Sequence, residues 1–418
     1  MAATTLTVYP EAASVDGGRL SVGGCDAIEL AREFGTPAYV YAEDDLRARA
    51  REYVEALRAH HDGPGEVVYA SKAFPCTAAL ALFAEEGLSC DVASGGELHL
   101  ALAAGFDPAR IHLHGNAKSE AELAMAVEAG VGWIVLDNHD DVDKLARVLA
   151  PTRPSRPERR QRVLIRVTPE VEADTHAAIL TGHAESKFGF NLAAARELAL
   201  NPPAHLDVQG LHVHIGSQLF DLAPYREAVA ALAELGDFPV YNLGGGMAAA
   251  YTRADRPPGA DPSVAAIVVA AHRLLGADKT LVIEPGRSLV ANAGVTLYRV
   301  ESVKGDFVAV NGGMSDNLRP MLYDAVYEAD IADRVGDGGA FTVVGKHCES
   351  GDVLVERASL RDPRPGDVLV TPVTGAYGHA LANNYNGVPR PPVIFCSGGE
   401  ARAVVRRETY DDLTSRDL

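Results

Sequence analysis

The chain has 418 residues, 47% hydrophobic and 23% charged, which is ordinary for a soluble globular protein of about two domains. The formal net charge of −19 argues against nucleic-acid binding, because contact with phosphates requires a basic face. No apolar run is long enough to cross a bilayer and no signal-peptide pattern is present, so no membrane association is expected. The five cysteines are scattered and form no CxxC pair, which favours a reducing cytoplasm over a disulfide framework or a cysteine zinc site.

The first forty-odd residues contain short elements of mixed type. Residues 25–34 are predicted to form a helix ended by Gly35, and residues 38–41 a strand. Helical periodicity then extends over residues 44–60.

From about residue 65, short apolar strands alternate with alanine-rich helices. The eight predicted strands are 67–70, 90–93, 111–114, 133–137, 163–167, 208–215, 240–243 and 281–284. Eight strands separated by helices over about 220 residues predict a (β/α)8 barrel. A doubly wound sheet that binds a dinucleotide would carry GxGxxG after its first strand, and none occurs. Residues 151–160 are predicted as a solvated loop, and residues 170–190 as a long, mobile loop that covers the carboxyl face of the barrel.

After residue 288 the alternation of strands and helices ends, and the remaining predicted elements are short strands. These are predicted at 296–303, 307–310, 341–344, 368–370, 393–396 and 402–406. The pattern predicts an α/β protein in which residues 45–288 form the barrel and residues 1–44 with 289–418 form a second, β-rich domain.

Lys72 stands where the first barrel strand ends and a helix is about to begin. The apolar run 67–70 precedes it, and Pro75 with an alanine-rich stretch follows. Barrel enzymes place their chemistry at this end of the strands, and a lysine among apolar neighbours has its ammonium form disfavoured, which frees the amine to attack a carbonyl. Lys72 is therefore interpreted as the residue that carries pyridoxal phosphate as a Schiff base. The plainer alternative is a surface lysine at a strand end.

Other barrel strands also end in polar or glycine-rich clusters. Gly244 to Gly246 follow the seventh strand, where barrels commonly hold phosphate through backbone amides, and Ser217 offers a hydroxyl. Glu284 ends the eighth strand and suits a pyridine nitrogen, because a nearby carboxylate keeps that nitrogen protonated. Arg287 suits a carboxylate or phosphate by bidentate contact, or it pairs with Glu284.

His212 and His214 point the same way along one strand. Such a pair can bind a metal, as in barrel hydrolases, or place one imidazole flat against a cofactor ring. An uncharged core histidine is the alternative for His212.

Three clusters in the β-rich domain carry reactive side chains. Residues 346–352 combine Cys348 with Glu349 and a second acid, so the thiol is either a small buried apolar group or an acidified proton donor. Residues 317–323 and 375–378 place arginine and tyrosine at loop positions that suit carboxylate recognition.

Taken together, these segments resemble the alanine-racemase-fold, pyridoxal-phosphate-dependent (fold type III) amino acid decarboxylases, and within them the meso-diaminopimelate decarboxylases. The matching motifs occur in the family order: YASKAF, DVASGGEL, HGNAKSEAEL, SKFGF, LHVHIGSQ, NLGGG, EPGRSLVANAG, LRPMLY, GKHCESGD and GAYGHALANNYN. They are spread over most of the chain after about residue 65, and as a set they are highly specific.

The resemblance implies a role for each matched residue. Lys72 is similar to the Schiff-base lysine and His214 to the imidazole stacked on the pyridine ring. The phosphate and ring-nitrogen contacts correspond to Gly246, Glu284, Pro285, Gly286 and Arg287. The residues that hold the distal carboxylate of the substrate correspond to Arg287, Arg319 and Tyr323, and the contact to its distal amine to Glu349. Cys348 resembles the proton donor, and Tyr377 a contact to both cofactor and substrate.

The implied reaction is the decarboxylation of meso-2,6-diaminopimelate at its D centre to L-lysine and carbon dioxide. The resemblance also implies a homodimer in which Cys348 and Glu349 reach the barrel of the other subunit. A relative that acts on ornithine, arginine or a carrier-linked amino acid is the nearest alternative. A racemase and a metal-dependent hydrolase fit the residues less well, and no metal is expected.

Overall fold

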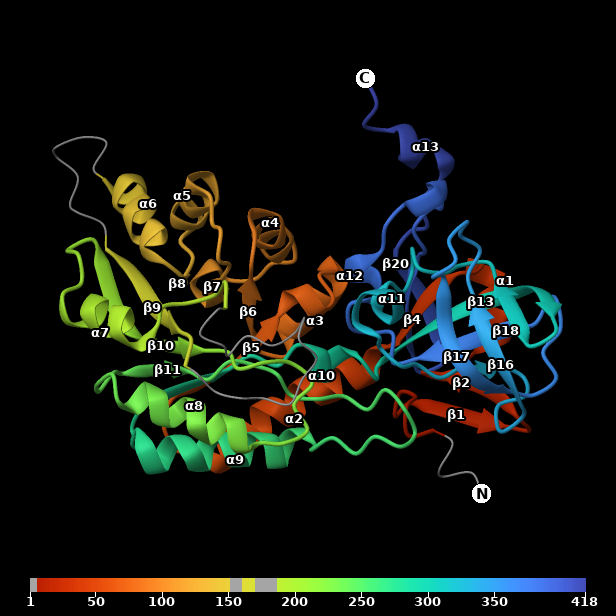
Figure 1. Ribbon diagram of the computed structural model, residues 1–418, viewed down its shortest axis with the longest axis horizontal. Coiled ribbons are helices and arrows are strands. Elements are labelled where there is room, and N and C mark those ends of the chain that lie inside the picture. Colours follow the sequence, from red (N-terminus) through yellow and green to blue (C-terminus); the bar gives the residue numbers. More distant parts are fainter. Residues whose placement is uncertain (1–5, 151–159, 170–185) are drawn as a thin grey trace. The chain divides into compact units, whose positions relative to one another are not determined.

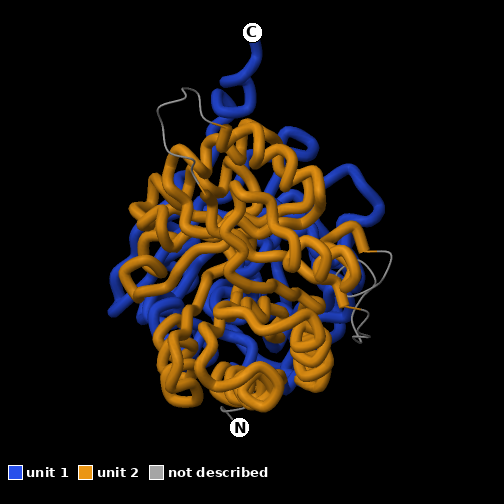
Figure 2. The backbone as a smooth tube through the Cα atoms, turned by 90° about the vertical axis from the view of Figure 1, so that its left-hand side faces the viewer, with its two compact units in different colours: residues 1–49, 249–256, 287–418 blue, residues 50–248, 257–286 orange. Residues whose placement is uncertain are grey.

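The computed structural model describes residues 6–150, 160–169 and 186–418. The predicted loops 151–160 and 170–190 therefore lie largely outside the described residues. The chain divides into two compact units, which Figure 2 shows in different colours. We call residues 50–248 with 257–286 the barrel unit, and residues 1–49, 249–256 and 287–418 the β-rich unit.

Eight parallel strands of the barrel unit close into a barrel, as the sequence predicts. They are β5 (Gly65–Ala70), β6 (Ser89–Val92), β7 (Ile111–Leu113), β8 (Trp133–Leu136), β9 (Gln161–Val167), β10 (Leu206–Val213), β11 (Val240–Asn242) and β12 (Thr280–Ile283). Pairing of β12 with β5 and of β9 with β10 completes the ring. The observed strand ends differ from the predicted ones by no more than two residues.

Helices surround this barrel, as Figure 1 shows. Those lying wholly or mostly in the barrel unit are α2 (Glu43–His60), α3 (Thr77–Glu85), α4 (Gly95–Ala103), α5 (Glu120–Ala129), α6 (His139–Leu149), α7 (Leu192–Leu200), α8 (Ala223–Ala233) and α9 (Ala260–Leu274). Their starts follow from capping chemistry: Ser94 accepts from the Glu97 amide before α4, and Ser119 forms a capping box with Glu122 before α5. Each such cap contributes about 1 kcal/mol.

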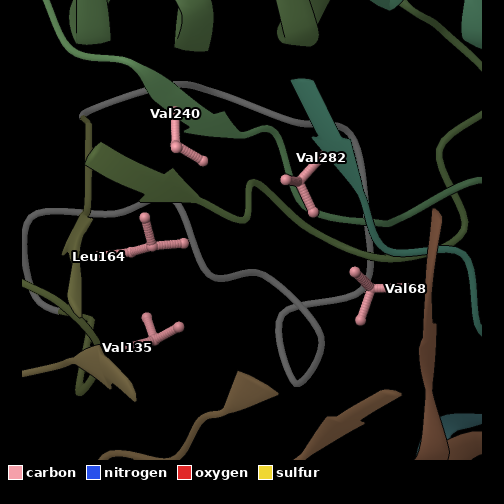
Figure 3. Close-up of a cluster of buried hydrophobic side chains, with 5 residues drawn as sticks. All are labelled: Val68, Val135, Leu164, Val240 and Val282. Carbon is pink, nitrogen blue, oxygen red and sulfur yellow. The ribbon is translucent and has the colours of Figure 1, made fainter. Parts of the chain in front are cut away.

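The centre of the barrel is apolar. Buried side chains from five strands point toward one another in Figure 3: Val68, Val135, Leu164, Val240 and Val282. Full burial of a side chain of this size stabilises the fold by about 1.5–3 kcal/mol. Residues two positions further along a strand share the same face, so Asn242 and Glu284 follow Val240 and Val282 toward the carboxyl ends. The apolar layer therefore lies below a group of polar side chains at the carboxyl ends of the strands. We call this end the barrel mouth.

The β-rich unit contains two sheets, and this separate β-rich domain confirms the second part of the predicted fold. The larger has the order β17–β16–β14–β13–β4–β19–β20, with β18 paired to β13 and β15 to β18. Its strands are β4 (Ala38–Ala42), β13 (Gly294–Lys304), β14 (Phe307–Val310), β15 (Asp330–Ile331), β16 (Gly339–Val344), β17 (Val353–Leu360), β18 (Val368–Pro372), β19 (Val393–Ser397) and β20 (Glu400–Val405). The smaller sheet contains β1 (Ala13–Asp16), β2 (Arg19–Val22) and β3 (Cys25–Asp26).

The helices of this unit are short: α1 (Ala27–Phe34), α10 (Arg287–Val290), α11 (Arg319–Tyr323), α12 (Gly378–Leu381) and α13 (Tyr410–Thr414). The predicted helix 25–34 begins two residues late, because Asp26 caps it by accepting from the Ile28 and Glu29 amides. No helix in the described part of the chain is both long and apolar enough to span a bilayer.

One segment departs from the predicted domain division. Residues 249–256 were expected inside the barrel domain, but they cluster with the β-rich unit. Asn292 donates to the Ala250 carbonyl at 3.0 Å, and Arg253 pairs with Glu328 and Asp330. Because of these contacts, residues 249–256, which follow the glycine turn 244–246, belong to the β-rich unit.

Candidate active site

Lys72 lies in a short 3₁₀ turn, Ser71–Ala73, that follows β5. The Ala70 amide donates to the Pro285 carbonyl at 3.2 Å, which joins the carboxyl ends of β5 and β12. The Lys72 side chain is exposed, and its charge acts on His214, whose pKa burial lowers well below the ordinary value and the neighbouring ammonium lowers further. Lys72 therefore stands at the mouth of the barrel beside a neutral imidazole.

Glu284 is the centre of a buried polar network at this mouth. His114 Nε2 lies 3.0 Å from its Oε1 and His212 Nε2 lies 3.2 Å from its Oε2. Asn242 donates to Oε1 at 2.5 Å. Burial alone would raise the pKa of Glu284, but His114 and His212 hold it well below the ordinary value. The carboxylate is therefore ionised although its side chain is buried.

The pKa values of the two histidines of this network shift in opposite directions. Burial lowers the pKa of His212 to about 4, so it is neutral at physiological pH. Burial acts on His114 in the same direction, but Asp91 and Glu284 outweigh it and raise its pKa. Pairing with these carboxylates thus favours the protonated form of His114 beside the ionised Glu284.

The turn Gly244–Gly246 requires glycine. Gly244 and Gly246 have φ of 69° and 112°, values that favour glycine. A Cβ on Gly245 would lie 2.1 Å from the Glu284 carbonyl oxygen, and one on Gly246 would lie 2.7 Å from that of Gly216. The Gly245 amide donates to His214 Nδ1 at 3.2 Å. The turn thus combines close backbone packing with a fixed orientation of the His214 imidazole. Ser217 lies half-buried in the loop after β10.

His212 and His214, for which metal binding was one alternative, are engaged in different contacts, with Glu284 and with the Gly245 amide. The described residues instead place donor atoms of His112, His114 and Glu284 within 4.8 Å of one another. His114 is already paired with Glu284 at 3.0 Å, and His112 Nε2 lies 3.3 Å from the Glu66 carboxylate, so we assign these side chains to ion pairs within the barrel.

A second group of candidate residues lies in the β-rich unit. We call it the arginine–tyrosine cluster, and it consists of Tyr251, Arg287, Arg319, Tyr327 and Tyr377. Arg287 Nη1 donates to the Tyr251 hydroxyl at 2.7 Å and Arg319 Nη1 to the Tyr327 hydroxyl at 2.5 Å. The Arg287 guanidinium carbon lies 4.9 Å from the Tyr377 ring centroid, and that of Arg319 lies 4.5 Å from the Tyr251 ring.

The structure thus brings the predicted Arg287, Arg319 and Tyr377 together, and it includes two tyrosines that the sequence analysis missed. Tyr251 follows the glycine turn by five residues and Tyr327 follows Arg319 by eight, so proximity to those motifs was the available signal. Tyr323 is half-buried at the end of α11. Within the described ranges, no hydrogen bond joins it to either arginine.

Cys348 and Glu349 lie on the loop between β16 and β17, and both are exposed. Asp352 holds this loop from one side by accepting from the amide and the ring Nδ1 of His347 at 2.9 and 2.8 Å. Asn386 holds it from the other side, since the Cys348 amide donates to Asn386 Oδ1 at 2.9 Å. The loop therefore presents an ordered thiol and carboxylate to the surface of the unit.

Known proteins share this arrangement of sequence and fold. Residues 43–291 match the pyridoxal-binding domain of the pyridoxal-dependent decarboxylases. The chain is 45% identical to the diaminopimelate decarboxylase of Bacillus subtilis, over 96% of this chain and 95% of that one. It is 44% identical to the diaminopimelate decarboxylase of Actinosynnema pretiosum subsp. auranticum, over 98% and 95% of the two chains.

Among solved structures, the diaminopimelate decarboxylase of M. jannaschii has a TM-score of 0.90 at 31% identity and covers 98% of both chains. The chain belongs to the pyridoxal-dependent decarboxylase family. Within that family its relatives are the diaminopimelate decarboxylases. One of these, from Helicobacter pylori, was solved in complex with L-lysine; its TM-score is 0.86 at 30% identity, over 93% of this chain and 98% of that one.

The barrel mouth fits pyridoxal phosphate, the cofactor of this family, on three independent grounds. Lys72 supplies the amine that an aldehyde requires. Glu284 is ionised, as a partner of a protonated ring nitrogen must be. The turn 244–246 has no side chains, so its backbone amides can approach a phosphate closely.

Proposed function

We propose that the chain catalyses the decarboxylation of meso-2,6-diaminopimelate to L-lysine and carbon dioxide. The observation that carries this substrate is the arginine–tyrosine cluster, in which Arg287 and Arg319 are both buried against tyrosine rings. A substrate with a single carboxylate, which is the group to be lost, has no use for two buried guanidinium groups. Diaminopimelate keeps a second carboxylate, to which guanidinium groups bind with bidentate geometry.

In this proposal Lys72 would hold the aldehyde of pyridoxal phosphate through its amine. When bound, pyridoxal phosphate supplies an electron sink for the bond that breaks at the α-carbon. Glu284 would keep a proton on the ring nitrogen, and the neutral His214 would hold the ring. Ser217, Gly246 and the stretch Glu284–Pro285–Gly286–Arg287 would hold the phosphate, and Tyr377 would contact both cofactor and substrate.

The remaining residues recognise the far end of the substrate and complete the reaction. Arg287, Arg319 and Tyr323 hold the distal carboxylate, and Glu349 binds the distal amine. This arrangement leaves the D centre for bond cleavage. Cys348 then donates the proton that replaces the lost carboxylate on the α-carbon.

The proposal includes a homodimer with shared active sites. Cys348 and Glu349 are exposed, and the same unit exposes the apolar side chains Leu322, Val326 and Tyr385. Exposed apolar groups of this size are typical of protein interfaces. A second copy of the chain would cover them and take up the thiol and carboxylate. A cytoplasmic location is part of the proposal and is supported by the five free thiols.

A substrate panel tests the function. Carbon dioxide release is measured from meso-diaminopimelate, its L,L isomer, ornithine, arginine and L-lysine, and the chirality of the product is determined. We expect turnover of the meso compound with L-lysine as product. Equal or faster release from ornithine or arginine would replace the proposed substrate with one that lacks a second carboxylate.

A further inference from the structure

Tyr251 is a buried residue of the arginine–tyrosine cluster to which neither the motifs nor the proposed mechanism gives a role. Its hydroxyl accepts from Arg287 Nη1 at 2.7 Å, and the Arg319 guanidinium carbon lies 4.5 Å from its ring centroid. The Tyr327 ring packs edge-on against it, with the centroids 5.3 Å apart. One phenol therefore contacts both guanidinium groups, the first through its oxygen and the second through its ring face.

Two cations held close together in a buried site repel each other, since little solvent is present to screen them. Tyr251 reduces this repulsion in two ways, because its oxygen accepts from one cation and its π-face attracts the other. Burial alone would raise the pKa of Tyr251, but Arg287 and Arg319 lower it below the ordinary value. Because the net shift is downward, the two cations together change the pKa of Tyr251 more than burial does.

We infer that Tyr251 is a positioning residue that holds Arg287 and Arg319 together as one carboxylate-binding pair, and so sets the preference for a substrate with two carboxylates. This inference rests on the proposed function and deepens it. The neutral phenol uses its oxygen to accept from Arg287 and retains its own proton to donate to a bound carboxylate. The residue thus orders the arginines and adds a donor to the same anion.

The same geometry predicts that the affinity for the distal carboxylate falls at alkaline pH. Once Tyr251 loses its proton, its negative oxygen competes with the distal carboxylate for both cations. The charged and titratable groups that contact it are Arg287, Arg319 and Tyr327. Burial raises the pKa of Tyr327 to about 12, so that phenol is still protonated when Tyr251 ionises.

The test compares holoenzyme with the Tyr251→Phe variant, which keeps the ring and removes the hydroxyl. The KM and kcat for meso-diaminopimelate are measured, together with the dissociation constant for pimelate, a dicarboxylate without amines, by titration calorimetry from pH 7 to 10.5. We expect Tyr251→Phe to raise KM and the pimelate dissociation constant about tenfold, as befits one lost hydrogen bond to a charged group. We expect kcat to change less than twofold. Pimelate binding to the wild type should weaken at alkaline pH, and the variant should lose that dependence.

Tyr298→Phe is the matched control, because it removes the hydroxyl of another buried tyrosine of the same unit, on β13. A fall in kcat with unchanged KM, or the same response in Tyr298→Phe, would overturn the inference. If Tyr251→Phe does not fold, a wild-type pimelate constant that is flat up to pH 10.5 overturns it equally. Failure of the wild type to turn over meso-diaminopimelate rejects the proposed function and this inference together, whereas an unaffected variant of an active enzyme rejects the inference alone.

Discussion

The barrel mouth and the arginine–tyrosine cluster handle charge in opposite ways. At the mouth, Glu284 is buried with His114 and the Asn242 amide, which both contact its oxygens. In the cluster, the buried Arg319 lies against the Tyr251 ring, and the Tyr327 hydroxyl accepts its hydrogen bond. The first arrangement keeps a permanent negative charge, which suits the ring-nitrogen partner that we propose Glu284 to be. The second stabilises cations without neutralising them, so they are able to bind an incoming carboxylate.

The largest effect is expected at Lys72. Lys72→Ala removes the covalent attachment and should lower kcat by on the order of 10³-fold or more. The visible absorbance band of the bound cofactor should disappear at the same time. Lys304→Ala, which changes an exposed lysine at the end of β13, should alter neither. A Lys72→Ala protein that keeps the absorbance band would show that the barrel mouth does not carry the cofactor.

Glu284→Gln should lower kcat by about 10²–10³-fold, because a neutral amide no longer favours a protonated ring nitrogen. Glu66 gives a matched control at the amino end of β5, where it accepts from Ser89 and lies 3.3 Å from His112. Glu66→Gln should reduce thermal stability and leave kcat within about twofold. If the two variants lose kcat equally, the ionised carboxylate at the mouth has no special role.

The same carboxylate predicts a response to acid. The pKa of Glu284 is depressed in the folded chain, so its ionised form adds stability above the ordinary pKa of 4.5, and this stability is lost as the pH falls below 4.5 toward the folded-state value. The melting temperature of the wild type should therefore fall more steeply below pH 4.5 than that of Glu284→Gln. If calorimetry shows that the melting temperatures of the two proteins fall equally steeply with pH, the network described for the barrel mouth is contradicted.

Arg319→Lys tests the arginine–tyrosine cluster. Lysine keeps the charge but loses the planar fork and its stacking on Tyr251. We expect the KM for meso-diaminopimelate to rise about 10²-fold and kcat to change little. The control is Arg299→Lys, an exposed arginine paired with Glu301. A loss confined to kcat would place Arg319 in the chemical step instead of in substrate recognition.

The smallest effect is expected from the loop that bears Cys348. Asp352→Asn replaces an acceptor of the His347 ring and amide, which should cost about 1–3 kcal/mol of folding free energy. Proton delivery should slow about tenfold, seen as a lower kcat with an unchanged KM. Asp306→Asn, on the exposed β13–β14 turn, serves as control. An Asp352→Asn enzyme with a normal kcat would show that order in this loop does not limit the reaction.

Much of the fold was predictable because its signals are local. The barrel strands are short apolar runs ended by polar clusters, and the helices start at side-chain caps such as Ser94 and Ser119. The segment 249–256 clusters with the β-rich unit through Glu328 and Asp330, which lie more than 70 residues further along the chain. The periodic pattern of hydrophobic residues carries no information about contacts between residues so far apart in the chain.

Local sequence patterns predict the barrel, the strand-end positions of Lys72 and Glu284, and the glycine turn, since each depends on neighbours within a few residues. The pairing of His114 with Glu284 and the contacts of Tyr251 with Arg287 and Arg319 are visible only in the folded chain. Burial and electrostatic pairing depend on distances in space, and the chain sets those distances only once distant strands and loops have packed together.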